Sequence, residues 1–181
     1  AITAKLSAVV NKQFRRRGVV AALSGGIDSS VVGALCVRTF GESRVLGLLM
    51  PERESAPETL ELSRLIARHL GIETLEVDIT STLEALGCYA GRDQAIRSVI
   101  PEYTTEYQCK IVLPSLLERE RYSLFSVVVR SPAGEQRTER LPYRAYLQIL
   151  AASNFKQRTR KMIENYHADR LNYAVTGTPN R

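Results

Sequence analysis

The sequence predicts an α/β protein built on an open, doubly wound parallel sheet with helices on both faces. Three observations support this fold class. Apolar runs alternate with helix-like segments along residues 18–78, a glycine-rich turn follows the first apolar run, and a helix-like segment precedes a last apolar run at 172–176. Strands that alternate with helices in this way form parallel sheets through right-handed crossovers.

The regular part of this pattern can be divided into elements in order. The sequence predicts a helix at 2–17, a strand at 18–23, a helix at 28–40, a strand at 44–50, a helix from 55–57 to 70, a strand at 73–78, a helix at about 154–170 and a strand at 172–176. Gly41 and Gly71 are typical helix C-caps, and Pro57 suits a first helical turn. On the third helix, helical spacing predicts a buried stripe of Leu62, Leu65, Ile66, His69 and Leu70.

Residues 84–150 break the alternation. The run at 122–130 predicts a strand, Ser131-Pro132-Ala133-Gly134 a turn, and 136–141 a returning strand, which together form a β-hairpin. We therefore expect a single domain over residues 1–181 with an insertion at about 84–150. The sequence leaves three alternatives open for this insertion: a lid, a dimer contact, or no role.

The composition excludes several classes of protein. The chain of 181 residues is 44% hydrophobic and 24% charged, and its apolar runs are short. A membrane-spanning helix needs about 20 apolar residues, so we expect no membrane partner and a cytoplasmic location. Cys36, Cys88 and Cys109 are scattered, which argues against a disulfide framework, a zinc site or an iron–sulfur site.

The formal net charge of +6 predicts an anionic partner. The run Arg15-Arg16-Arg17 fits either a nucleic-acid patch or the solvated end of a helix. Proteins that bind single-stranded nucleic acid combine their basic groups with aromatic side chains, and none are interleaved here. We therefore expect no nucleic-acid partner.

The segment Ser24-Gly25-Gly26-Ile27-Asp28-Ser29-Ser30 joins the first strand to the next helix. Glycines let a backbone approach a ligand closely, and the unpaired N–H groups of a new helix attract anions. Ser24, Ser29 and Ser30 add hydroxyl groups suited to phosphate oxygens, and Asp28 adds a carboxylate suited to Mg²⁺. The segment therefore predicts a phosphate site with a metal ligand, against the alternative of an ordinary turn capped by Ser24.

The kind of phosphate site follows from the pattern. A Walker A loop requires Gly-Lys-Ser/Thr and the dinucleotide fingerprint requires Gly-x-Gly-x-x-Gly, and neither occurs in this segment. The segment instead resembles the SGGxDS loop of the PP-loop ATP pyrophosphatases. The resemblance implies a Rossmann-like fold of the adenine nucleotide alpha hydrolase type, and a loop that holds the pyrophosphate leaving ATP.

A second motif lies near the C-terminus. It reads Asn154-x-Lys156-x-Arg158-x-Arg160, then Tyr166-His167-Ala168-x-Arg170-Leu171-Asn172-Tyr173, then Gly177-Thr178-x-Asn180. Together with the first loop, this spacing resembles the NAD synthetases, over residues 18–83 and 154–181. The resemblance implies an ATP-dependent amide ligase that activates the carboxylate of deamido-NAD as an acyl-adenylate and amidates it with ammonia, releasing AMP and pyrophosphate.

The resemblance also implies roles for individual residues. Asp28 would hold Mg²⁺, and Asp28 and Arg158 are the candidate catalytic residues. The candidate ATP contacts are Ser24, Gly25, Gly26, Asp28, Ser29, Ser30, Leu49, Met50 and Thr178. The candidate contacts to deamido-NAD are Asn154, Lys156, Arg158 and Arg160. Because a spacing of two places Lys156, Arg158 and Arg160 on different helix faces, we expect one or two of them to point into the site, with the alternative of a charged helix surface.

The family pattern continues after Gly-Thr-x-Asn with an acidic metal ligand, a Gly-Asp-Gly loop and a lysine. This sequence stops at Arg181, so we expect the C-terminal part to be missing. We also expect the use of free ammonia, with a separate glutaminase subunit as an alternative, and the homodimer typical of the family. The open alternatives for function are a related PP-loop ligase for another carboxylate and an inactive nucleotide-binding paralogue.

Overall fold

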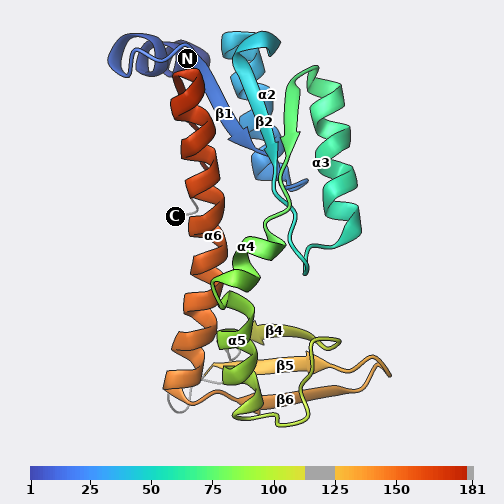
Figure 1. Cartoon of the computed structure of the whole chain (residues 1–181). Helices are drawn as coiled ribbons and strands as arrows, with labels where there is room; N and C mark the ends of the chain where they lie inside the picture. The colour runs from blue at the N-terminus through green and yellow to red at the C-terminus, as the bar shows by residue number, and fades with distance from the viewer. Residues whose placement is uncertain (113–124, 179–181) are drawn as a thin grey trace. The chain divides into compact units, whose positions relative to one another are not determined.

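The computed structural model describes residues 1–112 and 125–178. The chain forms two compact units (Figure 1). Unit 1 contains Ala1–Ser81 and Arg158–Arg181, and unit 2 contains Thr82–Gln157. Among the described residues, no helix is both long enough and apolar enough to cross a membrane.

Unit 1 is built on a four-stranded parallel sheet with the strand order β3-β2-β1-β7. Its strands are β1 (Gly18–Ala22), β2 (Val45–Leu49), β3 (Glu73–Glu76) and β7 (Tyr173–Val175). In the register, Val19 of β1 lies between Val45 of β2 and Ala174 of β7. These strands confirm the predicted parallel sheet, with ends that differ from the predicted ones by one or two residues.

The helices of unit 1 are α1 (Ile2–Ser7), a π-helical turn (Ala8–Gln13), α2 (Ile27–Phe40), a 3₁₀ turn (Glu42–Arg44), α3 (Pro57–Leu70) and the second half of α6 (Tyr143–Leu171). β2 and β3 follow β1 on one side, whereas β7 pairs with its other side. Right-handed crossovers then place α2 and α3 on one face of the sheet and α6 on the other. Figure 1 shows α3 and the end of α6 on opposite sides of the strands.

Two helix boundaries differ from the sequence prediction by more than one residue. The first helix ends at Gln13 rather than at residue 17, because Arg15 turns the chain with a φ of 53°. The last helix begins at Tyr143, eleven residues before the predicted start, so its first part belongs to unit 2. Gly41 and Gly71 end α2 and α3 with positive φ angles, as predicted.

The buried stripe predicted for α3 is partly wrong. Leu62 is 47% exposed and Leu65 is 52% exposed. The fully buried residues of this helix are instead Ser63 and Ala67, whose small side chains let α3 pack closely on the sheet. The core beneath the helices is formed by Val19, Ala21, Leu23, Cys36, Phe40, Val45, Leu49, Ala67 and Ile72, with Val10 from the N-terminal segment.

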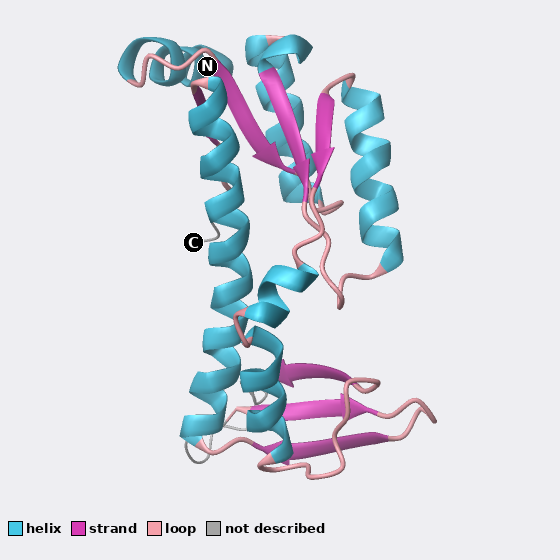
Figure 2. Ribbon diagram, viewed as in Figure 1, coloured by secondary structure: helices cyan, strands magenta, loops and turns pink. Residues whose placement is uncertain are grey.

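Unit 2 combines short helices with an antiparallel sheet (Figure 2). Its elements are α4 (Thr80–Ala85), which begins in unit 1, α5 (Cys88–Arg97), β4 (Gln108–Val112), β5 (Ser126–Arg130), β6 (Gln136–Arg140) and the first half of α6. β5 and β6 form the predicted hairpin, although residues 122–124 lie outside the described residues. β4, which pairs with β5, was not predicted.

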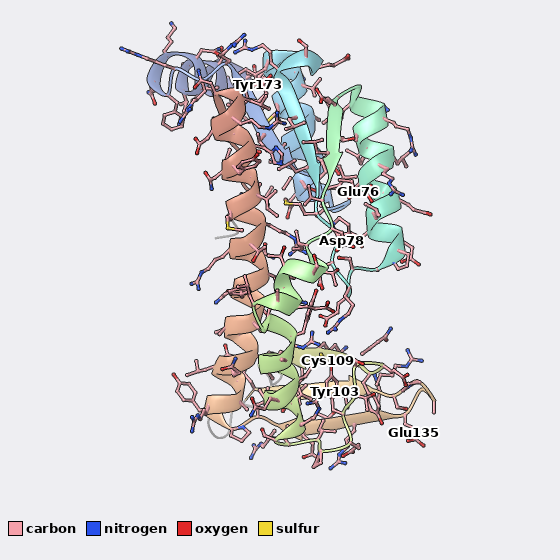
Figure 3. All side chains as sticks on the ribbon, viewed as in Figure 1. Glu76, Asp78, Tyr103, Cys109, Glu135 and Tyr173 are labelled. Atoms are coloured by element: carbon pink, nitrogen blue, oxygen red, sulfur yellow. The ribbon has the colours of Figure 1, made fainter. Side chains whose placement is uncertain are left out.

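The core of unit 2 lies between its sheet and its helices. Val127 and Val129 are buried on one face of β5, where they pack with Ile96 of α5 and Ile149 of α6. Two neighbouring charges in α5 are also buried, and Arg92 donates to Asp93 at 2.7 Å. The phenol of Tyr103 donates to the sulfur of Cys109 at 3.7 Å, both labelled in Figure 3.

Candidate functional site

The loop after β1 has a conformation that requires glycine at one position. Gly25 has a φ of 71°, and a Cβ atom there would lie 2.6 Å from the carbonyl oxygen of Thr59 and 3.0 Å from the Cβ of Leu62. Gly26 has a φ of −81°, and a Cβ atom there would only meet the hydroxyl of Ser24 at 3.4 Å. The close packing of the loop on α3 therefore depends on Gly25.

The serines of the loop bond to one another and to the backbone. Ser29 is buried, and its hydroxyl donates to the carbonyl of Gly26 at 2.9 Å and accepts from the N–H of Ser24 at 3.2 Å. Ser30 also donates to the carbonyl of Gly26, at 2.8 Å. Ser24 is exposed, and its hydroxyl lies 3.1 Å from that of Ser29. Ser29 and Ser30 thus hold the turn in shape, while Ser24 faces solvent.

The N-terminus of α2 supplies groups for an anion and a cation. The helix begins at Ile27, and its first N–H groups have no partner inside the helix. Asp28 lies in this first turn, and its carboxylate is exposed and has no protein partner among the described residues. Mg²⁺ is commonly held by one or two carboxylates together with substrate phosphates. A single free carboxylate beside an anion-binding helix end fits this donor set.

A buried hydroxyl fixes α3 against the start of the loop. Ser63 donates to the carbonyl oxygens of Leu23, at 3.1 Å, and of Thr59, at 2.8 Å. Leu23 itself donates its N–H to the carbonyl of Leu48 at 2.9 Å, which continues the β1–β2 pairing by one residue. The loop is thereby attached at its base to the sheet and to α3.

The carboxyl end of β2 lies beside the same loop, because β1 and β2 are parallel neighbours. The side chains of Leu49 and Met50 are buried, 2% and 7% exposed, and Leu49 belongs to the core. The carbonyl of Met50 accepts from the Nε of Arg160 at 3.4 Å. Arg160 is therefore the predicted basic residue whose side chain reaches the end of β2.

The other predicted residues of α6 have different surroundings within their own units. Arg158 is exposed on unit 1 and makes no hydrogen bond or ion pair with the described part of the protein. Asn154 and Lys156 belong to unit 2, where Asn154 is exposed and the ammonium of Lys156 lies 5.1 Å from the ring centre of Tyr89. Within unit 1, Arg160 is thus the predicted basic residue with a bond to a strand end.

The carboxyl end of β7 completes the group of strand ends. Thr176 bonds to the carbonyl of Val20 through both its N–H and its hydroxyl, at 3.0 Å in each case. Its own carbonyl accepts from Lys161 at 3.1 Å. Thr178 follows as an exposed residue, whereas Asn180 lies outside the described residues.

Sequence reasoning did not single out Lys161 and Glu164. Glu164 is 2% exposed and accepts from the ammonium of Lys161 at 2.5 Å. Burial raises the pKa of the Glu164 carboxyl, while Lys161 and then Arg160 act to lower it. The available signal was a lysine and a glutamate three residues apart on one helix, which elsewhere usually indicates an exposed pair.

Unit 1 therefore gathers several predicted residues at the carboxyl ends of β1, β2 and β7. Open parallel sheets bind ligands beyond these ends, where the strand order changes direction. Here the change falls between β1 and β7, because the chain runs from β1 through β2 to β3 on one side and returns on the other side of β1 at β7. Unpaired helix N–H groups, a free carboxylate and a guanidinium are chemically suited to a nucleoside polyphosphate with a divalent cation.

Comparisons with known proteins agree on one family. The family model of NAD synthase matches residues 1–103. An NH(3)-dependent NAD(+) synthetase of Mesorhizobium japonicum is 54% identical over 168 residues, which is 93% of this chain and 53% of that protein. The corresponding protein of Rhizobium meliloti is 52% identical over 94% of this chain and 51% of its own length. The chain thus spans about half the length of the curated relatives it matches.

A solved structure gives the same result. The NH3-dependent NAD synthetase of Campylobacter jejuni is 25% identical, with a TM-score of 0.57, and the match covers 99% of this chain and 56% of that one. The NAD+ synthetase of Burkholderia pseudomallei, 18% identical with a TM-score of 0.55, shares the fold. Because the family model covers more than half of the residues, the chain belongs to the NAD synthase family.

Proposed function

We propose that the protein is an ammonia-dependent NAD synthetase, an ATP-dependent amide ligase. In the proposed reaction, a carboxylate oxygen of deamido-NAD attacks the α-phosphorus of ATP, and the bond from that phosphorus to pyrophosphate breaks. Ammonia then attacks the acyl carbon, the bond to AMP breaks, and NAD forms. The observation that carries this proposal is the 49–54% identity to three relatives named NH(3)-dependent NAD(+) synthetase, over 93–95% of this chain.

The loop after β1 supports a role in holding the leaving pyrophosphate. We propose that the backbone N–H groups of Gly25 and Gly26 and those of the first turn of α2 face its oxygens, together with the hydroxyl of Ser24. Ser29 and Ser30 act in this proposal through their bonds to Gly26, which keep the loop in its shape. Such preorganised donors stabilise charge that develops on a leaving group.

Asp28 is the proposed ligand of Mg²⁺. The ion would supply charge neutralisation for the polyphosphate, and the residue's contribution is to place one free carboxylate beside the N-terminus of α2. Arg160 is the best supported contact to the polyphosphate or to deamido-NAD, because it reaches the end of β2. The roles of Leu49, Met50, Thr178, Asn154, Lys156 and Arg158 remain predictions from the resemblance, as do the homodimer and the possible glutaminase subunit. The absence of nucleic-acid and membrane partners and the cytoplasmic location remain predictions from the composition.

The test is an assay of the protein with ATP, Mg²⁺, ammonium and deamido-NAD, in which AMP, pyrophosphate and NAD are measured. We expect equal amounts of the three products, dependent on all four additions. Release of pyrophosphate only with a different carboxylic acid would instead support the related ligase. Binding of ATP without any release would support the inactive paralogue.

The metal assignment has its own test. Asp28→Asn keeps the size of the side chain but removes its charge, so we expect turnover to fall at least 100-fold, about 2.7 kcal/mol of transition-state stabilisation. Raising the Mg²⁺ concentration should recover part of the activity. Asp169→Asn, at the exposed far end of α6, is the control. Equal activity of the Asp28→Asn variant and the wild type would refute the assignment.

A further inference from the structure

Glu164 poses an energetic problem for unit 1. Its carboxylate is 2% exposed, and removing an ion from water is unfavourable unless a partner and further hydrogen bonds compensate for the loss. The partner is Lys161, whose ammonium donates to it at 2.5 Å, while Arg160 contributes a second favourable charge. Glu164 therefore fixes the ammonium of Lys161 at one place on α6.

Lys161 connects this carboxylate to the end of β7. Its ammonium also donates to the carbonyl of Thr176 at 3.1 Å, the first residue beyond the strand. Thr176 in turn is fixed to Val20 of β1 by its N–H and its hydroxyl. The side chain of Lys161 is therefore held between the carboxylate of Glu164 and the carbonyl of Thr176. Gly177 and Thr178 follow directly after this carbonyl.

The same helix turn reaches the end of β2. Arg160 precedes Lys161 in sequence, and its Nε donates to the carbonyl of Met50 at 3.4 Å. Arg160 and Glu164 lie four residues apart on α6, so their side chains share one face of the helix. Glu164 is thus close in sequence to two basic side chains, Lys161 and Arg160, which bond to the carboxyl ends of β7 and β2.

We propose that Glu164 and Lys161 are positioning residues for the nucleotide, which fix the path of the chain after β7 and the direction of Arg160. This inference rests on the proposed function, in which Thr178 and Arg160 lie at the bound nucleotides. Glu164 touches no substrate in this account. It acts through Lys161 on the Thr176 carbonyl, and through its charge on Arg160.

The experiment compares steady-state kinetics of Glu164→Gln, Lys161→Met and the double variant. Glu164→Gln keeps the shape but not the charge, and Lys161→Met removes the donor to Thr176. We expect each single variant to raise the KM for ATP about tenfold with kcat changed less than threefold. We expect the double variant to resemble the more affected single one, because both changes break the same connection. Lys161→Arg keeps a cation and a donor, so it should recover part of the affinity.

A matched control separates positioning from stability. Glu76, labelled in Figure 3, forms an exposed ion pair with Arg64 in the same unit, at 2.8 Å. Glu76→Gln should leave both KM and kcat unchanged. The melting temperature of each variant is also measured, to detect any loss of stability. A loss of melting temperature in Glu164→Gln with an unchanged KM for ATP would overturn the proposal, as would additive effects in the double variant.

The outcome is distinguishable from failure of the proposed function. If the wild type makes no NAD from deamido-NAD, the proposed function fails, and equilibrium binding of ATP to the same variants then tests the positioning role. Weaker ATP binding in Glu164→Gln and Lys161→Met, with partial recovery in Lys161→Arg, would support it. Equal ATP binding by all variants would refute it.

Discussion

Replacing Gly25 by alanine should destabilise unit 1 more than any other single methyl addition in the loop. The φ of 71° places Gly25 in the left-handed region, which costs a residue with a side chain about 1–2 kcal/mol. The new methyl group would also lie 2.6 Å from the backbone oxygen of Thr59, and relief of such overpacking typically costs about 1–3 kcal/mol. The expected loss in the free energy of unfolding is therefore about 2–5 kcal/mol.

Gly26→Ala is the matched control for this change. Gly26 has an ordinary φ of −81°, and its new methyl group would find the Ser24 hydroxyl at 3.4 Å as its nearest neighbour. Alanine restricts the unfolded chain, which stabilises by about 0.4–1 kcal/mol, but Gly26 is the N-cap of α2, where alanine is less favourable than glycine. The two effects oppose each other, so the net change should stay within about 1 kcal/mol. Urea unfolding followed by circular dichroism measures both variants. A loss in Gly25→Ala no larger than the change in Gly26→Ala would refute the reasoning.

Three further changes test other parts of the structure. Ser63→Ala removes a buried hydroxyl that donates to Leu23 and Thr59, so urea unfolding should show a loss of about 1–3 kcal/mol, and a neutral effect would contradict its anchoring role. Burial raises the pKa of the Cys36 thiol from 9.0 to about 11, so the unfolded chain loses this proton at lower pH than the folded one. Stability should therefore fall as the pH rises from 9 to 11, and Cys36→Ala should reduce this slope; an identical slope would argue against the raised pKa. Glu76→Gln breaks an exposed ion pair and should cost less than about 1 kcal/mol in thermal unfolding, with a larger loss showing that the pair matters more than its exposure suggests.

The sequence was sufficient to predict the sheet of unit 1. β1 and β2 are short apolar runs between turn residues, whereas β3 is a mostly exposed Glu-Thr-Leu-Glu segment. The glycines at 41 and 71 mark helix ends that depend on local backbone conformation. The stripe on α3 was harder to predict, because helical spacing locates an apolar face but does not say which face packs. Ser63 and Ala67 are buried because small side chains allow close approach to the sheet, and periodicity of large apolar residues does not detect this.

The candidate site likewise has features that could be predicted from the sequence and features that could not. The loop 24–30 could be located because its residue types and their order reflect a local requirement, namely positive φ at Gly25 and free N–H groups at the start of α2. Spacing could not predict which basic side chain of α6 bonds to the carbonyl of Met50, because the two residues are 110 positions apart in sequence. Spacing also gave no sign that Glu164 is buried.

The pairing of β1 with β7 has a consequence for synthesis of the chain on the ribosome. β1 is nearly fully buried, with Val19 at 1% and Val20 at 0% exposed, but one of its two neighbours consists of residues 173–175. Until that segment emerges, β1 presents unpaired backbone groups and apolar side chains, as an edge strand prone to join other chains. The nascent protein therefore carries this unpaired strand edge through the translation of all of unit 2.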